Sequence, residues 1–143
     1  MTGNGLIVGV GNPDRGDDGA GIHAARRLRP LRRVAEVTDC STLLDLWAEE
    51  DDVTVIDATS SGAEPGTIVR LDGLCDVLAP SAPRSTHSLG LAESVELARA
   101  LGKLPSRLTV YGIEASSFHH GESLSPQVEA AVETLARSLG GTG

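Results

Sequence analysis

The chain has 143 residues, of which 40% are hydrophobic and 22% charged, in keeping with one soluble globular domain that has its own core. It has one Trp, one Tyr and one Phe, so Leu, Val, Ile and Ala must fill that core. The net charge of -8 argues against a nucleic-acid backbone or an anionic membrane surface as a partner, because both repel an acidic protein.

Five short apolar runs rich in β-branched residues predict the strands of a sheet. In chain order they are LIVGVG at 6–11, VAEVT at 34–38, VTVIDA at 53–58, TIVRLD at 67–72 and LTVYGI at 108–113. We expect the second run to lie nearer an edge. The fourth follows the third through a turn that is too short for a crossover helix, which predicts one antiparallel edge strand.

Helical spacing of apolar residues separates these runs. It predicts helices at 17–29, 41–50, 88–101 and 125–139, the last with Ser125 as N-cap and Pro126 in the first turn. Alternation of strands and helices predicts an α/β sandwich with a largely parallel sheet. We expect a single domain over 1–143, with 140–143 as a disordered tail.

The turn after the first strand, GVGNPDRGDDGAG, concentrates glycines and carboxylates. A GxGxxG dinucleotide-binding fingerprint would need its third glycine at the position of Asp14. The anionic dinucleotide would also meet three carboxylates, so a dinucleotide site is the weaker interpretation of this turn. Helix capping accounts for Asp17 as N-cap and Asp18 as a first-turn acid. It leaves Asn12, Asp14 and the crowded glycines unexplained, whereas a bound cation would account for them.

Two further residues suit such a cation. Asp57 ends the third strand, where α/β sheets commonly place their sites, and His87 precedes a helix in RSTHSLGL. Taken alone, an aspartate such as Asp57 caps a loop about as often as it forms part of a site. Taken alone, His87 is more often a solvated loop histidine than a metal ligand. Together with Asp18 they form an oxygen, oxygen, nitrogen set suited to a borderline divalent metal with open positions.

Other reactive residues have simpler interpretations. Cys40 could be a nucleophile with His87, but a buried thiol is the better reading, and we expect both Cys40 and Cys75 to be reduced and half-buried. Asp39 ranks below the three main site residues. The chain has neither a His-Glu-x-x-His zinc helix nor a Gly-x-Ser-x-Gly elbow.

A second cluster lies in the Gly/Ser-rich stretch 115–125. His119 and His120 are expected to be solvated, although with Glu114 and Glu122 nearby they could bind a metal or contact a partner. A basic cluster lies at the end of the first predicted helix and just after it: Arg26, Arg27, Arg29, Arg32 and Arg33. We interpret it as a solvent-exposed surface whose arginines form salt bridges.

Four ordered segments together resemble the hydrogenase maturation proteases. Three look like that family's signature segments and the fourth like its C-terminal segment: GVGNPDRGDDGAG, VIDATSSGAEPGTI, THSLGL and YGIEASSFHHGESLSPQVEAAV. The resemblance extends from about residue 5 to residue 139.

The resemblance implies an endopeptidase that removes the C-terminal extension from the large-subunit precursor of a nickel–iron hydrogenase after nickel insertion. It implies a twisted, mainly parallel five-stranded sheet flanked by helices in a three-layer sandwich. By position, the metal-contacting residues fall on Asp18, Asp57 and His87. Many members have Glu at the first of these, so Asp18 is one methylene shorter. Nickel would arrive with the precursor rather than being held permanently.

Two chemical routes stay open at this point. A metal held by these ligands could polarise the scissile carbonyl or lower the pKa of a bound water, or Asp18 or Asp57 could act as general base. The rival of another class is a maturation chaperone that binds metal or precursor without cleaving it. We expect a cytoplasmic protein, because the start of the chain resembles no secretory signal and no apolar run has the length of a membrane span. We also expect a monomer.

Overall fold

The computed structural model describes residues 5–76, 90–119, 121 and 123–140. Five strands form one sheet in the order β2-β1-β3-β5-β4. The strands are β1 (Leu6–Val10), β2 (Arg33–Val37), β3 (Asp52–Thr59), β4 (Ile68–Asp72) and β5 (Arg107–Glu114). The pairs β1–β2, β1–β3 and β3–β5 are parallel and β4–β5 is antiparallel, which confirms the predicted fold class.

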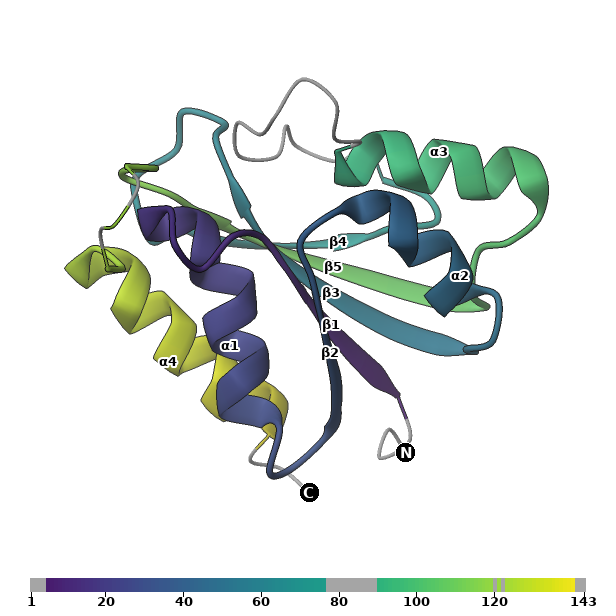
Figure 1. Ribbon diagram of the computed structural model, residues 1–143, viewed down its shortest axis with the longest axis horizontal. Coiled ribbons are helices and arrows are strands. Elements are labelled where there is room, and N and C mark those ends of the chain that lie inside the picture. The colour runs from purple at the N-terminus through teal and green to yellow at the C-terminus, as the bar shows by residue number, and fades with distance from the viewer. Residues whose placement is uncertain (1–4, 77–89, 120, 122, 141–143) are drawn as a thin grey trace.

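Helices cover both faces of this sheet (Figure 1). One face carries α1 (Ala20–Leu28) and α4 (Pro126–Gly140), and the other carries α2 (Leu43–Trp47) and α3 (Leu91–Leu101). Two short 3-10 helices, η1 (Gly16–Gly19) and η2 (Cys40–Thr42), lead into α1 and α2. No helix of the described residues is long and apolar enough to cross a membrane.

Each face of the sheet has its own apolar core. Ile7, Ile56 and Ile113 point toward α1 and α4, whereas Val8, Val55 and Val110 point toward α2 and α3. This division follows from the alternation of side chains along a strand. The central strands β1 and β3 are buried almost throughout, as expected of strands covered on both faces.

The predicted boundaries need small corrections at helix ends. Helix α1 begins at Ala20 rather than at 17, because η1 occupies the preceding four residues. Helix α4 begins at Pro126 as predicted and continues to Gly140, one residue into the expected tail. Residues 141–143 lie outside the described residues.

Candidate functional site

Close backbone packing brings the glycine-rich turn against the sheet. A Cβ added to Gly21 of α1 would lie 2.1 Å from the carbonyl oxygen of Ile56 and 2.7 Å from that of Val10. One added to Gly9 of β1 would lie 2.3 Å from the carbonyl oxygen of Gly21. Side chains at these positions would push the helix outward. The glycines therefore let α1 and the preceding η1 lie directly on β1 and β3.

The backbone of the turn itself also needs glycine. Gly11 has φ +145°, and a Cβ there would lie 2.0 Å from the carbonyl oxygen of Asp18. That carbonyl accepts a hydrogen bond from the amide of Asn12 at 3.2 Å, and the amide of Asp18 donates to the carbonyl of Arg15 at 3.1 Å. The chain thus folds back on itself after β1, and both backbone polar groups of Asp18 are held.

Two of the three predicted metal-site residues lie at the same edge of the sheet. Asp18 in η1 and Asp57 near the end of β3 are each 1% exposed, and η1 contacts β3. Asp57 Oδ1 accepts a hydrogen bond from the amide of Ala58 at 2.8 Å, and Asp18 Oδ2 lies 3.9 Å from the guanidinium of Arg15. Burial of two carboxylates is expensive unless charge or hydrogen bonds compensate it, so this pair at the carboxyl-terminal edge of the sheet is a candidate site.

The third predicted ligand, His87, lies outside the described residues. Within the part of the chain that the structure describes, no three His, Cys, Asp or Glu side chains are grouped as a metal site would require. The described geometry therefore supplies a pair of carboxylates, and the complete ligand set of Asp18, Asp57 and His87 stays a prediction.

Asp17 does not cap its own helix, contrary to the sequence interpretation. Its buried carboxylate accepts hydrogen bonds from the amides of Ser116, Ser117 and Ser125, at 2.7, 3.1 and 2.7 Å, and from the Ser125 hydroxyl at 2.8 Å. Ser125 precedes the first residue of α4, and its carbonyl accepts from the amide of Glu129. Asp17 therefore caps α4 from a distant part of the chain.

Glu114 plays a comparable part for the loop after β3. Its carboxylate, on a residue only 5% exposed, accepts bonds from the hydroxyl of Thr59, the amide and hydroxyl of Ser61, and the amide of Gly62. Burial raises the pKa of Glu114, but the hydrogen bonds from Ser61, Thr59 and Gly62 outweigh it, so the pKa lies below its ordinary value. These hydrogen bonds give Glu114 a structural role in holding the loop after β3.

The lesser candidates occupy positions without an evident chemical role. Both cysteines are reduced, as predicted, but Cys40 is fully buried and Cys75 exposed, so neither is half-buried. Asp39 caps η2, with its carboxylate accepting from the amide of Ser41 at 3.0 Å. His119 is exposed, as expected of a solvated histidine. Residues 120 and 122, which complete the second predicted cluster, lie outside the described residues.

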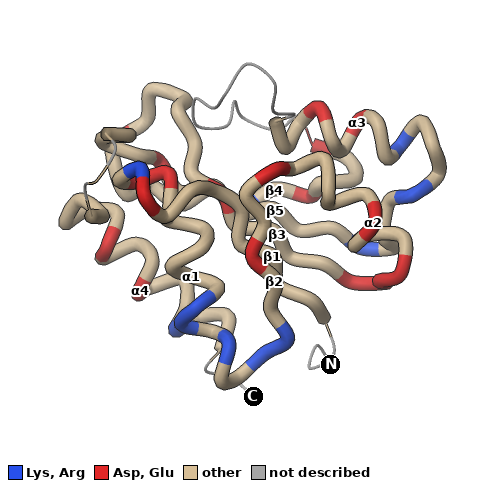
Figure 2. The backbone as a smooth tube through the Cα atoms, viewed as in Figure 1, with Lys and Arg blue, Asp and Glu red and all other residues tan. Residues whose placement is uncertain are grey.

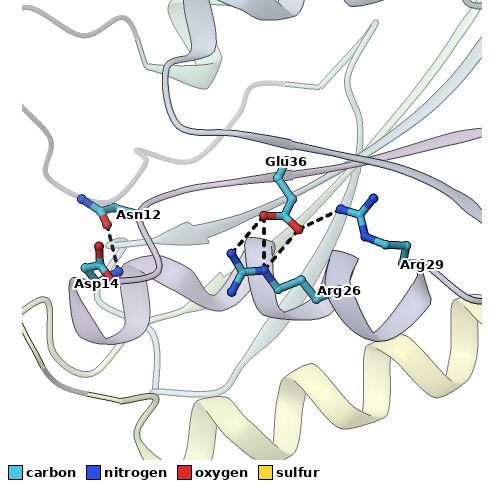
Figure 3. A network of polar contacts seen from close by, with 5 residues as sticks. All are labelled: Asn12, Asp14, Arg26, Arg29 and Glu36. Carbon is cyan, nitrogen blue, oxygen red and sulfur yellow. Dashed lines mark hydrogen bonds and ion pairs between the residues drawn. The ribbon is translucent and has the colours of Figure 1, made fainter.

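Basic residues gather at the end of α1 and the start of β2 (Figure 2). Arg26 and Arg29 both bind Glu36 of β2, as Figure 3 shows, at 3.1 and 2.8 Å. The hydrogen bond from Arg26 holds the pKa of Glu36 below its ordinary value, with Arg29 contributing, even though burial opposes the shift. Two further ion pairs join this cluster to carboxylates: Arg27 with Glu129 and Arg33 with Glu50. The predicted salt-bridged surface is thereby confirmed for four of its five arginines, whereas the part-buried Arg32 donates to the carbonyl of Leu139 at 2.9 Å.

Sequence reasoning missed the roles of Asp17 and Glu114 because both depend on contacts far apart in the chain. A signal for Asp17 does exist: α4 has Val128, not an acid, at its third helical position, where a capping box would place Glu or Gln. The N-cap amide of Ser125 then needs another acceptor, and Asp17 supplies it.

The family model for hydrogenase maturation proteases, HycI, matches residues 38–140. The hydrogenase 2 maturation protease of Escherichia coli K12 is 32% identical over 137 residues, which cover 90% of this chain and 83% of that protein. The hydrogenase expression/formation protein HupD of Rhizobium leguminosarum bv. viciae is 30% identical over 150 residues, covering 94% and 73%.

Solved structures agree with these sequence matches. The hydrogenase maturating endopeptidase HybD from Escherichia coli superposes with a TM-score of 0.72 at 27% identity, covering 95% of this chain and 89% of that one. The [NiFe] hydrogenase maturation protease HybD from Thermococcus kodakarensis gives 0.72 at 28% identity, covering 96% and 99%. Sequence and fold together confirm the resemblance: the chain belongs to the hydrogenase maturation protease family.

Proposed function

We propose that this protein is an endopeptidase that removes the C-terminal extension from a nickel–iron hydrogenase large-subunit precursor after nickel has been inserted. Family membership supports the reaction and the class of substrate. The observation that carries the proposal is the pair of buried carboxylates, Asp18 and Asp57, from elements that the glycine contacts bring together.

The nickel in this proposal belongs to the precursor and is part of the substrate. Asp18, Asp57 and His87 would contact it, and two carboxylate oxygens with one imidazole nitrogen suit a borderline divalent ion. Nickel would then orient the extension and polarise the scissile carbonyl. Asp18 or Asp57 would accept the proton of the attacking water as the peptide C–N bond breaks, and that proton would leave with the new amine.

Intact-mass spectrometry of a nickel-loaded precursor incubated with this protein tests the proposal. We expect one discrete C-terminal peptide to be lost, and we expect the nickel-free precursor to keep its mass. Stable binding of the loaded precursor without any mass change would instead support a non-proteolytic maturation chaperone. Cleavage of both precursors at equal rates would contradict a role for nickel in cleavage, but it would still establish peptidase activity.

We also propose that the protein acts in the cytoplasm as a monomer. Cell fractionation and light scattering of the purified chain would check these two points. Recovery with the membrane fraction, or a mass of twice the chain, would contradict them.

A further inference from the structure

The turn that carries Asp18 is bound to the segment 116–125 by its neighbour, Asp17. We propose that Asp17 is a positioning residue: it couples this C-terminal segment to the turn and thereby sets the place of the Asp18 carboxylate. The inference rests on the proposed function, because it gives Asp18 the role of a site residue. Asp17 itself contacts no substrate in this role.

The Asp17 carboxylate accepts hydrogen bonds from both ends of the segment 116–125. Its carboxylate, on a residue 1% exposed, accepts from four donors contributed by Ser116, Ser117 and Ser125, at 2.7–3.1 Å. Hydrogen bonds to an ionised acceptor are stronger than those between neutral groups. One carboxylate therefore holds both ends of the segment between β5 and α4.

Backbone contacts strengthen the same junction. The amide of Asp17 donates to the carbonyl of Ser117 at 2.9 Å, and the amide of Gly121 donates to the carbonyl of Asp14 at 2.7 Å. Gly16 has φ +56°, and a Cβ there would lie 3.0 Å from the carbonyl oxygen of Ser117. The turn and the segment are thus in direct backbone contact, with the Asp17 side chain closing the junction.

A shift of Asp17 would reach Asp18 directly. The two residues are adjacent in η1, and the remaining backbone supports of Asp18 come from Asn12 and Arg15 within the same turn. The contacts to 116–125 therefore support this short helix from outside the turn, together with its packing against β3. A misplacement of about 1 Å in a catalytic group can cost about 100-fold in rate, so this support matters for the reaction.

The position requires a carboxylate rather than an amide. Asp17 Oδ1 accepts from the amide of Ser125, while Oδ2 accepts from Ser116, Ser117 and the Ser125 hydroxyl. In Asp17→Asn, one of these oxygens becomes an NH2 group. Whichever way the amide is turned, its donors face at least one backbone N–H, and that contact is repulsive.

The test compares Asp17→Asn with two matched controls in cleavage of the nickel-loaded precursor. Asp45→Asn changes an exposed carboxylate of α2 on the opposite face of the sheet, and Leu135→Ala removes core contacts of α4 while leaving Asp17 and its partners in place. We expect Asp17→Asn to lower kcat by about tenfold or more, with KM within about threefold, because the misplaced group acts on the bound substrate. Both controls should keep the wild-type kcat at a temperature where all variants are folded.

Amide hydrogen exchange on the free protein gives a readout that does not need the reaction. In Asp17→Asn we expect faster exchange in both 14–19 and 116–125, with β1 and β3 unchanged. Faster exchange in 116–125 alone would overturn the coupling, whatever the kinetics show. So would a wild-type kcat for Asp17→Asn. Failure of the wild-type protein to cleave any precursor would instead count against the proposed function, and the exchange pattern would still decide whether Asp17 couples the two segments.

Discussion

Among the described residues, the buried charged side chains are four carboxylates, and they form two contrasting pairs: Asp17 with Glu114, and Asp18 with Asp57. Asp17 and Glu114 each accept hydrogen bonds from several backbone amides and hydroxyls of neighbouring loops. Asp18 and Asp57 are equally inaccessible, but they lie where η1 contacts β3 at the carboxyl-terminal edge of the sheet.

This contrast separates two uses of a buried carboxylate. A carboxylate enclosed by loop donors fixes the loops, and its loss should appear first in stability. A carboxylate placed at a shared edge for a metal and a peptide should matter chiefly for the reaction. Burial alone does not distinguish the two uses, because all four residues are at most 5% exposed.

The largest expected effect comes from Asp57→Asn. Asparagine keeps an Oδ1 that can accept from the amide of Ala58, so the fold should survive. We expect cleavage of the nickel-loaded precursor to fall by more than about 100-fold, the upper range for residues that only support metal ligands. Initial rates from mass spectrometry check this. Undiminished cleavage would remove Asp57 from the site.

A weaker effect is expected where the turn meets the sheet. In Gly21→Ala the new Cβ would lie 2.1 Å from the carbonyl oxygen of Ile56, so α1 must move outward. We expect unfolding free energy to fall by about 1–3 kcal/mol, with a loss of cleavage as Asp18 moves with the helix. Gly5→Ala at the other end of β1 is the control, because its Cβ would meet atoms only at 3.4 Å. Equal denaturation curves for the two variants would contradict the close-packing argument.

Glu114→Gln should sharpen the contrast from the structural side. It should lower the unfolding free energy by about 1–3 kcal/mol near neutral pH, because an amide cannot accept from all the loop donors. The pKa of Glu114 is depressed in the folded protein, so its contribution is present above the unfolded pKa and lost as pH falls through the folded pKa. The gap in Tm between wild type and variant should therefore narrow on acidification.

Thermal melts of both proteins from about pH 7 to about pH 3 measure this gap. The Glu114→Gln variant should also retain cleavage wherever it is folded. A gap in Tm that stays constant across the series would show that the Glu114 charge contributes nothing to folding.

The smallest effect is expected at the surface. Glu36→Gln removes the shared acceptor of Arg26 and Arg29, a network that is partly exposed to solvent. We expect a loss of less than about 1 kcal/mol, screened further by added salt, and no change in cleavage. Urea titrations at low and high salt check this. A larger loss, or one independent of salt, would mean that the network supports the packing of α1 on β2.

The fold was accessible from sequence because its signals are local. Alternating and continuous apolar runs predicted all five strands, and the short Pro65-Gly66 turn predicted the antiparallel pairing of β4. Helix starts were less accurate, since the sequence pattern does not distinguish the 3-10 turn at Gly16–Gly19 from the first turn of α1.

Local signals did not reveal which acid does what. Asp17 and Asp18 are adjacent and chemically alike, and only the tertiary contact with Ser116, Ser117 and Ser125 separates them. The N-cap preference of aspartate predicted that Asp17 caps its own helix. In the structure, Asp17 instead accepts a hydrogen bond from the amide of Ser125 at the start of α4. Roles that depend on a partner about 100 residues away require the fold, not the pattern.

The most direct test measures Tm and the initial cleavage rate for Asp17→Asn and Asp18→Asn side by side. We predict that Asp18→Asn loses more of the rate while its Tm falls less, and that Asp17→Asn shows the larger fall in Tm. Full cleavage by Asp18→Asn, or a larger loss of Tm in Asp18→Asn than in Asp17→Asn, would contradict the division between structural and site carboxylates.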